Sequence, residues 1–551
     1  MLTSARTVPH GETIRTDVCI IGGGPAGITL ARELASAQLD IVLLERGDAE
    51  RVQTVDEADS IINVGLPYPV EDTRALALGG SVHKWRVNTP DGGGFGRLRE
   101  LDPEDFDRRA WVAHSGWPFG KDELRRHYRT ARQLFDPRWE ADSPEEDLEA
   151  RLRPGPFEAE DPNVKSRVFY FADPSAFASR HKRRLEQAAN VLVLTNAAAT
   201  EICSDGLASS ISSVRVASSP SCRFSIIARV YVICAGAIET ARLLLASRSR
   251  FPTGLGNGYD LVGRYFMEHP HYFAGFFRPN CPESLQVVEN YAPHRQDGHL
   301  IQRKFTLGEK SLEQDALLRS AFMLNAEPRT EQVHKLGLSA QAESRLDSLR
   351  RLRRKLASDG PTSVEAADLR LAIMGAPQAA RHGITKARTA AGRRLGLSQY
   401  TSPSIFRISA MHEQIPNPSS RVSLADSTDG LDMPRAKLSW QLTEQDKRSM
   451  RLSQELFGRA LESRGHRKVT SLLENRDLPA VLNGGSHHMG TTRMHDSPRN
   501  GVVDRNARVH ATDNLYVAGA AVFPTVGYAN PTLTLLALTL RLAAHLRAEF
   551  A

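Results

Sequence analysis

The sequence predicts an α/β protein, α+β overall, in which one of two domains is built on a parallel sheet. The chain has 551 residues, too many for one hydrophobic core, so two domains are the default expectation. Residues 16–48 follow the order strand, glycine-rich turn, helix, strand. Two further apolar runs, 230–234 and 515–518, each end in small residues, as strands of the same sheet would.

The glycine-rich turn follows the short apolar strand Val18–Ile21. Gly22, Gly24 and Gly27 form the spacing GxGxxG, in which the first glycine allows a sharp turn and the second lets the backbone approach a pyrophosphate. The third lets the following helix pack closely on the strand. Glu45 stands 23 residues beyond Gly22, at the end of the next strand, where a carboxylate can accept hydrogen bonds from ribose hydroxyls. The pattern predicts a dinucleotide site that disfavours a 2′-phosphate.

Two later segments supply further strands of the parallel sheet. The run Val230–Cys234 leads through Ala235 into a helix, and Leu515–Ala518 leads into the turn Gly519-Ala520. Small residues at strand ends permit close approach of a ligand, although ordinary strand-to-helix packing explains the first run equally well on its own. Pro531 then opens a long helix at its first position, where the missing N–H costs nothing.

The predicted nucleotide-binding domain is therefore discontinuous, with residues 12–105, 185–265 and 495–551. Residues 106–184 and 266–494 form the second domain, with a basic helical insertion at about 340–398. Within it, residues 345–396 hold twelve Lys/Arg against four Asp/Glu, so a local charge of +8 accounts for the +7 of the whole chain. Leucines at 346, 349, 352 and 356 recur at helical spacing, which favours a solvated helical face over a dock for an acidic partner or a membrane surface. No nucleic-acid partner is predicted.

The composition is globular, with 41% hydrophobic and 25% charged residues. No apolar run is long enough for a membrane span and the first residues lack an apolar leader, so we expect a soluble, cytoplasmic protein. The five cysteines form no CxxC pair, which fits a reducing compartment and argues against a metal site. Redox chemistry would therefore need an organic cofactor.

Four stretches of the sequence resemble the glucose-methanol-choline (GMC) family of FAD-dependent oxidoreductases. One is the nucleotide turn, and the others are "LALGGSVHKW" (76–85), "LDPEDFDRRAWVAHSGWPF" (101–119) and the C-terminal block "HHMGTTRM" (487–494) with "VVDRNARVHATDNLYVAGAAVFPTVGYANPTLT" (502–534). A histidine followed by an asparagine, with the turn Gly519-Ala520, is most similar to pyranose oxidases and bacterial glycoside-oxidising members. The resemblance implies a GMC-type fold with a Rossmann-like FAD-binding domain and a substrate-binding domain built on an antiparallel sheet with helices.

The resemblance also implies the catalytic residues. In the family pattern H-x-x-G-T-x-R-M the base stands three residues before the Gly-Thr pair, which selects His487, and the second catalytic residue is Asn530, bonded to the substrate oxygen. An imidazole, with an unperturbed pKa of about 6.5, can take a hydroxyl proton near neutral pH. The residues expected to hold FAD are Gly22, Gly24, Gly27, Glu45, Gly79, Gly80, Ser81, Ala199, Ala235, Gly519, Ala520, Pro531 and Thr532.

The mode of FAD attachment is predicted from a departure from the family. Several relatives bond the flavin covalently to a histidine directly before the tryptophan of the Gly-Gly loop. Here Lys84 precedes Trp85, and His83 stands one residue earlier. Because adjacent side chains of an extended backbone point opposite ways, His83 is not expected to substitute, and FAD is predicted to be noncovalent.

Other polar side chains have two interpretations each. Asn530 before a helix-starting proline is also what an N-cap looks like. His488 would point away from His487 and form structural hydrogen bonds, or contact substrate. His412 and Gln414 share one face of a predicted strand, where they would meet sugar hydroxyls or lie on a solvent-facing edge.

The resemblance implies oxidation of a secondary alcohol of a sugar or glycoside to a ketone, with hydride transfer to flavin N5. Oxidation of a non-sugar alcohol such as a sterol or cyclitol, a flavoprotein lyase with a structural flavin, and a binding module acting through 345–396 remain alternatives. Oxygen, a quinone or a protein would each serve as electron acceptor. No metal is predicted.

Overall fold

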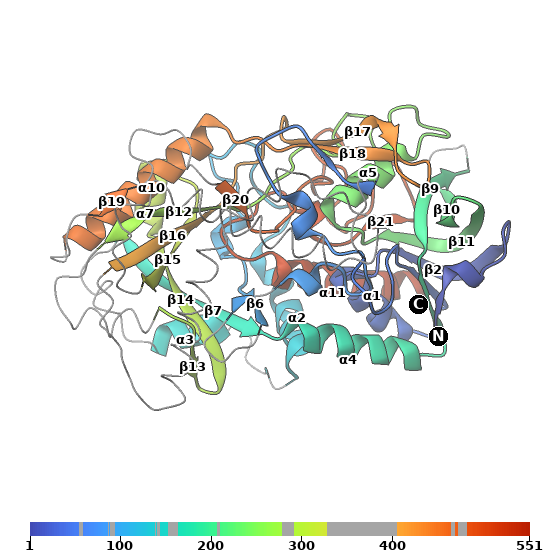
Figure 1. Ribbon diagram of the computed structural model, residues 1–551, viewed down its shortest axis with the longest axis horizontal. Helices are drawn as coiled ribbons and strands as arrows, with labels where there is room; N and C mark the ends of the chain where they lie inside the picture. The colour runs from blue at the N-terminus through green and yellow to red at the C-terminus, as the bar shows by residue number, and fades with distance from the viewer. Residues whose placement is uncertain are drawn as a thin grey trace, which may run out of the picture.

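The structure is a computed structural model, shown in Figure 1, in which two sheets lie along the long axis of the molecule. It describes residues 1–53, 59–85, 87–88, 94–137, 139, 144–151, 163–205, 210–277, 291–327, 405–463, 469–471 and 482–551. The whole of the predicted insertion 340–398, which includes the basic segment 345–396, and Cys281 lie outside these residues. Within them, no helix is both long and apolar enough to span a membrane.

The first sheet has eight strands within the described residues, with the order β1-β8-β3-β2-β11-β10-β9 and with β21 also pairing to β11. Its strands are β1 (Leu2–Ser4), β2 (Thr13–Ile21), β3 (Ile41–Leu44), β8 (Val191–Thr195), β9 (Ala198–Ser204), β10 (Ile211–Ser219), β11 (Cys222–Ile233) and β21 (Leu515–Val517). The pairs from β1 through β2 to β11 and β21 are parallel, and β9–β11 form an antiparallel extension. The three sequence segments predicted to build one parallel sheet therefore do so.

Helices cover both faces of this sheet. They are α1 (Pro25–Ala35), α4 (Pro174–Gln187), α5 (Gly236–Ala246) and α11 (Thr532–Phe550). Val18 and Ile20 pack with residues of α1 and α11 on one face, whereas Cys19 and Ile21 pack with residues of α5 on the other. Because both faces are covered, the strand reads as a continuous apolar run rather than an alternating one.

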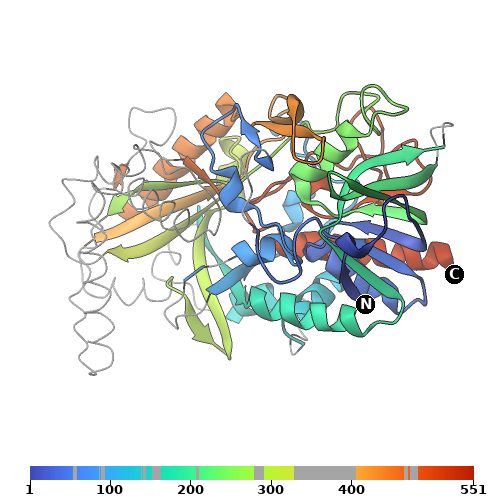
Figure 2. The same cartoon turned by 45° about the vertical axis from the view of Figure 1, so that its right-hand side comes forward.

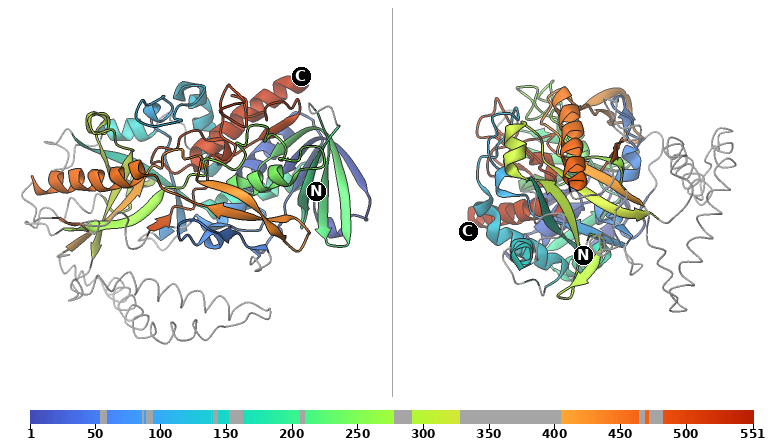
Figure 3. Two further views of the ribbon diagram at one scale, coloured as in Figure 1. Left: turned by 90° about the horizontal axis from the view of Figure 1, so that it is seen from above. Right: turned by 90° about the vertical axis from the view of Figure 1, so that its left-hand side faces the viewer.

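The second sheet has ten strands within the described residues, and all of its pairs are antiparallel. Its order is β19-β12-β16-β15-β14-β7-β6-β5, with β20 beside β12 and β13 beside β14. The strands are β5 (Val87–Asn88), β6 (Gly94–Leu98), β7 (Val164–Ala172), β12 (Pro270–Phe277), β13 (His294–Gln296), β14 (His299–Leu307), β15 (Ser320–Glu327), β16 (Ile405–His412), β19 (Thr470–Ser471) and β20 (Leu482–Gly484). Figure 2 and the left panel of Figure 3 show this sheet and α10 (Glu444–Glu462) at the opposite end of the molecule from α11.

The two faces of the antiparallel sheet have different neighbours. One face packs on α10, where the ring centroid of Phe457 lies 4.5 Å from that of Phe322 and 5.3 Å from that of Phe305. The other face meets the segment between β21 and α11, since Phe169 of β7 lies 6.3 Å from the ring of Tyr528. That C-terminal segment is therefore held between the two sheets.

A small third sheet and short helices complete the described residues. The sheet has the order β17-β18-β4. The remaining elements are β4 (Ile62–Asn63), β17 (Arg421–Thr428), β18 (Pro434–Ser439), α2 (Arg125–Phe135), α3 (Pro144–Arg151), α7 (Glu309–Gln314), and 3-10 turns at Ala5–Thr7, Val70–Thr73, Gly80–Lys84, Pro103–Asp105, Lys121–Leu124 and Ala520–Val522.

Strand pairing divides the chain differently from the predicted boundaries. β1 precedes residue 12 yet joins the parallel sheet, and β5 and β6 fall within 12–105 yet join the antiparallel one. α2 and all but the last turn of α4 fall within 106–184, but α2 packs beside α11 and α4 packs beside α1. Tyr128 of α2 is hydrogen-bonded to Thr534 of α11 over 2.9 Å. The predicted boundaries follow sequence motifs, whereas the chain crosses between the sheets within them.

Candidate active site

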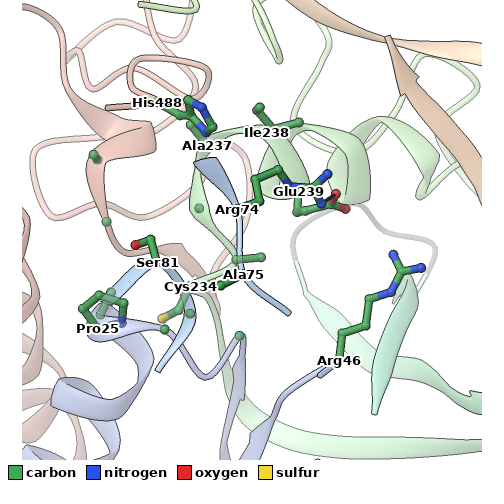
Figure 4. A pocket seen from close by; sticks show the side chains of 18 of the residues that line it. Pro25, Arg46, Arg74, Ala75, Ser81, Cys234, Ala237, Ile238, Glu239 and His488 are labelled. Atoms are coloured by element: carbon green, nitrogen blue, oxygen red, sulfur yellow. Dashed lines mark hydrogen bonds and ion pairs between the residues drawn. The ribbon is translucent and has the colours of Figure 1, made fainter. Parts of the chain in front are cut away.

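A pocket opens at the carboxyl ends of β2, β11 and β21, where the first sheet meets the C-terminal segment (Figure 4). Of the predicted cofactor residues, Gly22, Gly24, Glu45, Gly80, Ser81, Ala199, Ala235, Gly519, Ala520, Pro531 and Thr532 line it, together with His487 and His488. Gly27 and Gly79 do not line it. Arg74 and Glu239 also line the pocket and are ion-paired, and the two side chains lie close together in Figure 4.

The glycines of the first turn have separate steric roles. A Cβ at Gly22 would lie 2.6 Å from the Cys234 carbonyl oxygen, and the φ of Gly22 is +112°, so a sharp turn needs glycine there. A Cβ at Gly27 would lie 1.9 Å from the Gly22 carbonyl oxygen, so its absence lets α1 approach β2. A Cβ at Gly24 would meet nothing nearer than 4.0 Å. That free space at the start of α1 fits a pyrophosphate, which the helix N-terminus would attract.

Glu45 is fixed at the end of β3 by the backbone. Its Oε2 accepts from the Gly23 amide over 2.9 Å and its Oε1 from the Gly47 amide over 2.6 Å. Burial raises the pKa of Glu45 to about 7, against the opposing effect of these two hydrogen bonds. Because a carboxylate oxygen accepts more than one hydrogen bond, Glu45 retains capacity for ribose hydroxyls. The pocket and its donors thus fit FAD.

The second glycine loop lies against the first. The Gly79 amide donates to the Gly23 carbonyl over 2.8 Å, and a Cβ at Gly80 would stand 3.1 Å from the Gly24 Cα. Nε2 of His83 lies 3.0 Å from the Leu78 carbonyl oxygen. His83 is therefore hydrogen-bonded within its own loop.

The N-terminus of α11 reaches the pocket through Pro531 and Thr532. No side-chain cap bond forms at this helix start. Instead, Nδ2 of Asn530 lies 3.0 Å from Nε2 of His487, and Oδ1 of Asn530 is buried with no partner among the described residues. The structure therefore pairs the two residues expected to be catalytic and shows no cap role for Asn530.

The protonation pattern of His487 follows from its neighbours. The Gly527 carbonyl oxygen, 3.0 Å from Nε2 of His269, can only accept, so that nitrogen carries a hydrogen. Nδ1 of His269 is then an acceptor, 2.8 Å from Nδ1 of His487, which must donate to it. The remaining nitrogen of His487, Nε2, holds a lone pair that accepts from Asn530. A carbonyl oxygen thus fixes which nitrogen of His487 can act as a base.

Burial keeps these imidazoles neutral. It lowers the pKa of His269 to about 4 and that of His487 well below its usual value, and the nearby imidazoles of His269 and His271 lower the pKa of His487 further. A neutral imidazole is the form that can accept a proton.

Glu268 holds the loop that carries the two adjacent histidines. Its carboxyl group accepts from the backbone amides of His269, Gly485 and His487, over 2.8 to 3.0 Å, and from the hydroxyl of Tyr68. Burial raises the pKa of Glu268 to about 7. Nε2 of His488 lies 3.0 Å from the Tyr68 hydroxyl and 3.1 Å from Oγ1 of Thr73, so these hydrogen bonds are structural even though His488 lines the pocket.

The other two candidate substrate contacts lie elsewhere. His412 sits on the α10 side of the antiparallel sheet, 3.1 Å from the hydroxyl of Tyr272, and burial lowers its pKa to about 3. Gln414 accepts from the Glu268 amide and from the indole of Trp440, and its amide donates to the Gln441 carbonyl. Neither residue lines the pocket: Gln414 is hydrogen-bonded in the interior, and His412 faces Tyr272 on the side of the sheet that packs on α10.

Sequence reasoning missed Glu268 and His269. Both belong to "MEHPHYF" (267–273), where the sequence alone does not distinguish a substrate-facing strand from a solvent-facing strand edge. The weak signal was a hydrophilic Glu-His pair inside an otherwise apolar run between Phe266 and Phe273. Buried polar pairs of that kind need partners, and here the partners are the backbone and side chain of the catalytic loop.

Two family matches cover most of the chain. Residues 17–284 match the FAD dependent oxidoreductase family, and residues 416–539 match the GMC oxidoreductase family. The chain therefore contains an FAD-dependent oxidoreductase domain and a GMC oxidoreductase C-terminal domain. This confirms the predicted family and its FAD cofactor.

Relatives of this GMC protein include two curated oxidoreductases. The 6'''-hydroxyparomomycin C oxidase of Streptomyces lividus is 24% identical over 97% of this chain and 92% of its own. The fructose dehydrogenase large subunit of Gluconobacter japonicus is 26% identical over 58% of this chain, and the match spans about half (47%) of that subunit. Among solved structures, pyridoxine 4-oxidase from Mesorbium loti matches over 96% of this chain and 98% of its own, with a TM-score of 0.51 and 17% identity. That likeness confirms the predicted α/β fold.

Proposed function

We propose that this GMC protein uses noncovalent FAD to oxidise a secondary alcohol of a sugar or glycoside to a ketone, with His487 as base. The observation that carries the proposal is the lone pair on Nε2 of His487. His487 lines the pocket, and its Nε2 faces the side-chain amide of Asn530, which is not among the lining residues. The relatives named for fructose and hydroxyparomomycin C support a polyhydroxylated substrate.

The two side chains suit the first step of such a reaction. A substrate hydroxyl placed between them would donate its hydrogen to Nε2 of His487 and accept from Nδ2 of Asn530, replacing the bond that they make with each other. His487 then takes the proton while the carbon loses its hydride, so the alcohol becomes a ketone. When bound, FAD supplies the hydride acceptor at its N5. The carbonyl of Gly527, through His269, stabilises the form of His487 that gains this proton.

The position of His83 supports noncovalent attachment. Its Nε2 is engaged by the Leu78 carbonyl, within the loop that begins the second glycine turn. Lys84, the residue directly before Trp85, has no imidazole to bond to a flavin. Acid precipitation of the yellow protein should therefore leave the flavin in the supernatant.

Anaerobic stopped-flow mixing with candidate glycosides tests the proposal. The flavin absorbance should bleach, and His487→Ala should slow the bleaching about 10²-fold or more. His545→Ala, on the outer part of α11, is the matched control and should leave the rate unchanged. An unaltered rate in His487→Ala would remove this residue from the mechanism, and a flavin that stays oxidised during turnover would favour a lyase. Peroxide formation in air would separate oxygen from a quinone or protein acceptor.

A further inference from the structure

Three polar side chains share the face of the antiparallel sheet that meets the C-terminal segment. Residues paired directly in antiparallel strands lie on the same face. Arg97 pairs with Phe171, and Gln302 pairs with Phe169. Phe169 and Phe171 are two residues apart, as are Gln302 and Lys304, so Arg97, Gln302 and Lys304 lie on one face. This is the face on which Phe169 approaches Tyr528, two residues before Asn530.

The same face carries a histidine close to the proposed base. Met411 pairs with both His271 and Ala321, and Ala321 pairs with Thr306, two residues from Lys304. His271 therefore lies on the face of Lys304, and its ring centroid is 6.1 Å from that of His487. Nε2 of His271 is buried with no hydrogen-bond partner among the described residues. Polar groups thus extend from His487 across the sheet to Arg97.

Lys304 lacks the partners that a buried lysine needs. It is 0% exposed, and within the described residues its Nζ makes no hydrogen bond. Its contact is the ring of Phe169, 3.8 Å from Nζ. Burial, with the charges of Arg97 and Arg99, lowers the pKa of Lys304 well below its usual value. A buried amine with no acceptor is costly, so its presence calls for a ligand group that supplies one.

Arg97 also lacks an ionic partner among the described residues. Its Nε donates to Gln302 over 3.2 Å and its guanidinium lies over the ring of Phe171, but no described carboxylate is ion-paired with it. Burial lowers the pKa of Arg97 to about 10, so it remains a cation at neutral pH. The neighbouring Arg99 and Arg167 differ, because both are ion-paired with Glu149 and Arg99 also with Asp102. Of these four basic residues, Lys304 and Arg97 have no ion-paired carboxylate within the described part of the chain, whereas Arg99 and Arg167 do.

We propose that the sugar substrate carries an anionic substituent, a carboxylate or a phosphate, that binds Lys304 and Arg97 while its reacting hydroxyl meets His487 and Asn530. This rests on the proposed function and defines its substrate class. Lys304 and Arg97 supply donors suited to a carboxylate or phosphate, and the absence of a nearby described acid removes the competing partner. The FAD pyrophosphate does not serve this role, because its place is the start of α1 beside Gly24.

Calorimetric titration of the dithionite-reduced holoenzyme tests the inference, since the reduced enzyme binds a probe without oxidising it. The probes are methyl β-D-glucoside, methyl β-D-glucuronoside and glucose 6-phosphate. At least one anionic probe should bind about 10-fold more tightly than the glucoside, and which one does so distinguishes carboxylate from phosphate. Lys304→Met should abolish the preference while changing glucoside affinity less than threefold. Lys310→Met, exposed on α7, is the matched control.

A second measurement separates ligand binding from a structural role. Lys304→Met should raise the melting temperature of the unliganded holoenzyme, because it replaces an unpaired buried amine by an apolar chain of similar size. A lower melting temperature would show that Lys304 serves the fold and would overturn the inference. Equal affinity for all three probes, no binding of an anion, or a preference that survives in Lys304→Met would also overturn it. Flavin bleaching by neutral glycosides is judged independently, so the proposed function stands or fails by itself.

Discussion

The parallel and antiparallel sheets contribute to the site in different ways. The parallel sheet presents backbone: glycines, alanines and the starts of α1 and α11 line the pocket, and its chief polar side chain is Glu45. The antiparallel sheet and its loops present side chains: His269 contacts His487, and Lys304 and Arg97 are the anion contacts that we propose. A cofactor common to a family needs a constant backbone surface, whereas a substrate is distinguished by side chains.

The two halves of the site also differ in how far apart in the sequence their interacting residues are. The nucleotide half depends on short-range spacing, such as the five residues from Gly22 to Gly27. The substrate half depends on strand pairing across more than two hundred residues, since His269 reaches His487 and Arg97 reaches Gln302. Mutations in the first half should therefore affect folding or flavin retention, and mutations in the second should affect catalysis in a folded flavoprotein.

The largest effect is expected from Gly27→Ala. The added Cβ would overlap the Gly22 carbonyl oxygen at 1.9 Å, so α1 must move away from β2. We expect a loss of about 3 kcal/mol of stability, more than the gain of about 1 kcal/mol in helix propensity. Thermal unfolding followed by circular dichroism measures it.

Gly24→Ala is the matched variant for this test. Its Cβ meets no atom nearer than 4.0 Å and its φ of −77° suits alanine, so the fold should persist. Flavin affinity should fall about 10-fold, because the methyl group occupies the space predicted for the pyrophosphate. A stable Gly27→Ala protein, or a Gly24→Ala protein with unchanged flavin affinity, would contradict the division between packing and ligand glycines.

The next effect is expected in the substrate half, from His269→Phe. Without an acceptor at Nδ1 of residue 269, His487 is free to place its hydrogen on Nε2, the nitrogen that must act as base. We expect the limiting rate of flavin bleaching to fall about 10²-fold while flavin content and melting temperature change little.

His269→Asn provides the rescue. The Oδ1 of asparagine lies near the position of a histidine Nδ1 and accepts from His487, so much of the rate should return. If both variants lose the same activity, His269 contributes packing alone. The rate of the Phe variant should also change with pH more steeply than that of the wild type, an effect that a packing defect would not produce.

The sequence is sufficient to predict the elements whose signal is local. The strand Val18–Ile21 lies within β2, and the helix after it is α1. Two family motifs singled out His487 and Asn530, and the structure brings these two side chains together. The helix-cap interpretation of Asn530 came from an equally local pattern. The structure shows no such cap: Nδ2 of Asn530 faces His487, and Oδ1, the oxygen that would accept a cap bond, has no partner among the described residues.

The rest of the site is fixed by register, which no local pattern contains. Lys304 lies in the strand "HLIQRKFTL", two residues after Gln302, so the sequence predicts that the two side chains share one face. The sequence does not show which face of the sheet meets the C-terminal segment. His412 is a second example. The sequence predicted the strand that contains it, but strand pairing places its side chain on the face that packs on α10. The cofactor half was therefore more predictable than the substrate half.

The smallest change is expected in the pH dependence of the wild type. An unperturbed imidazole base, with a pKa of about 6.5, would lose about 10-fold of its rate at pH 5.5 because most of it would be protonated. Burial lowers the pKa of His487 well below that value, so the neutral form persists as the pH falls. The limiting bleaching rate should therefore vary less than threefold from pH 8 to 5.5. Any residual variation should centre near 7, where Glu268 titrates, and should disappear in Glu268→Gln. A 10-fold fall centred at 6.5 would mean that His487 is solvated during turnover, and the antiparallel sheet would then not exclude water from the base as its buried side chains indicate.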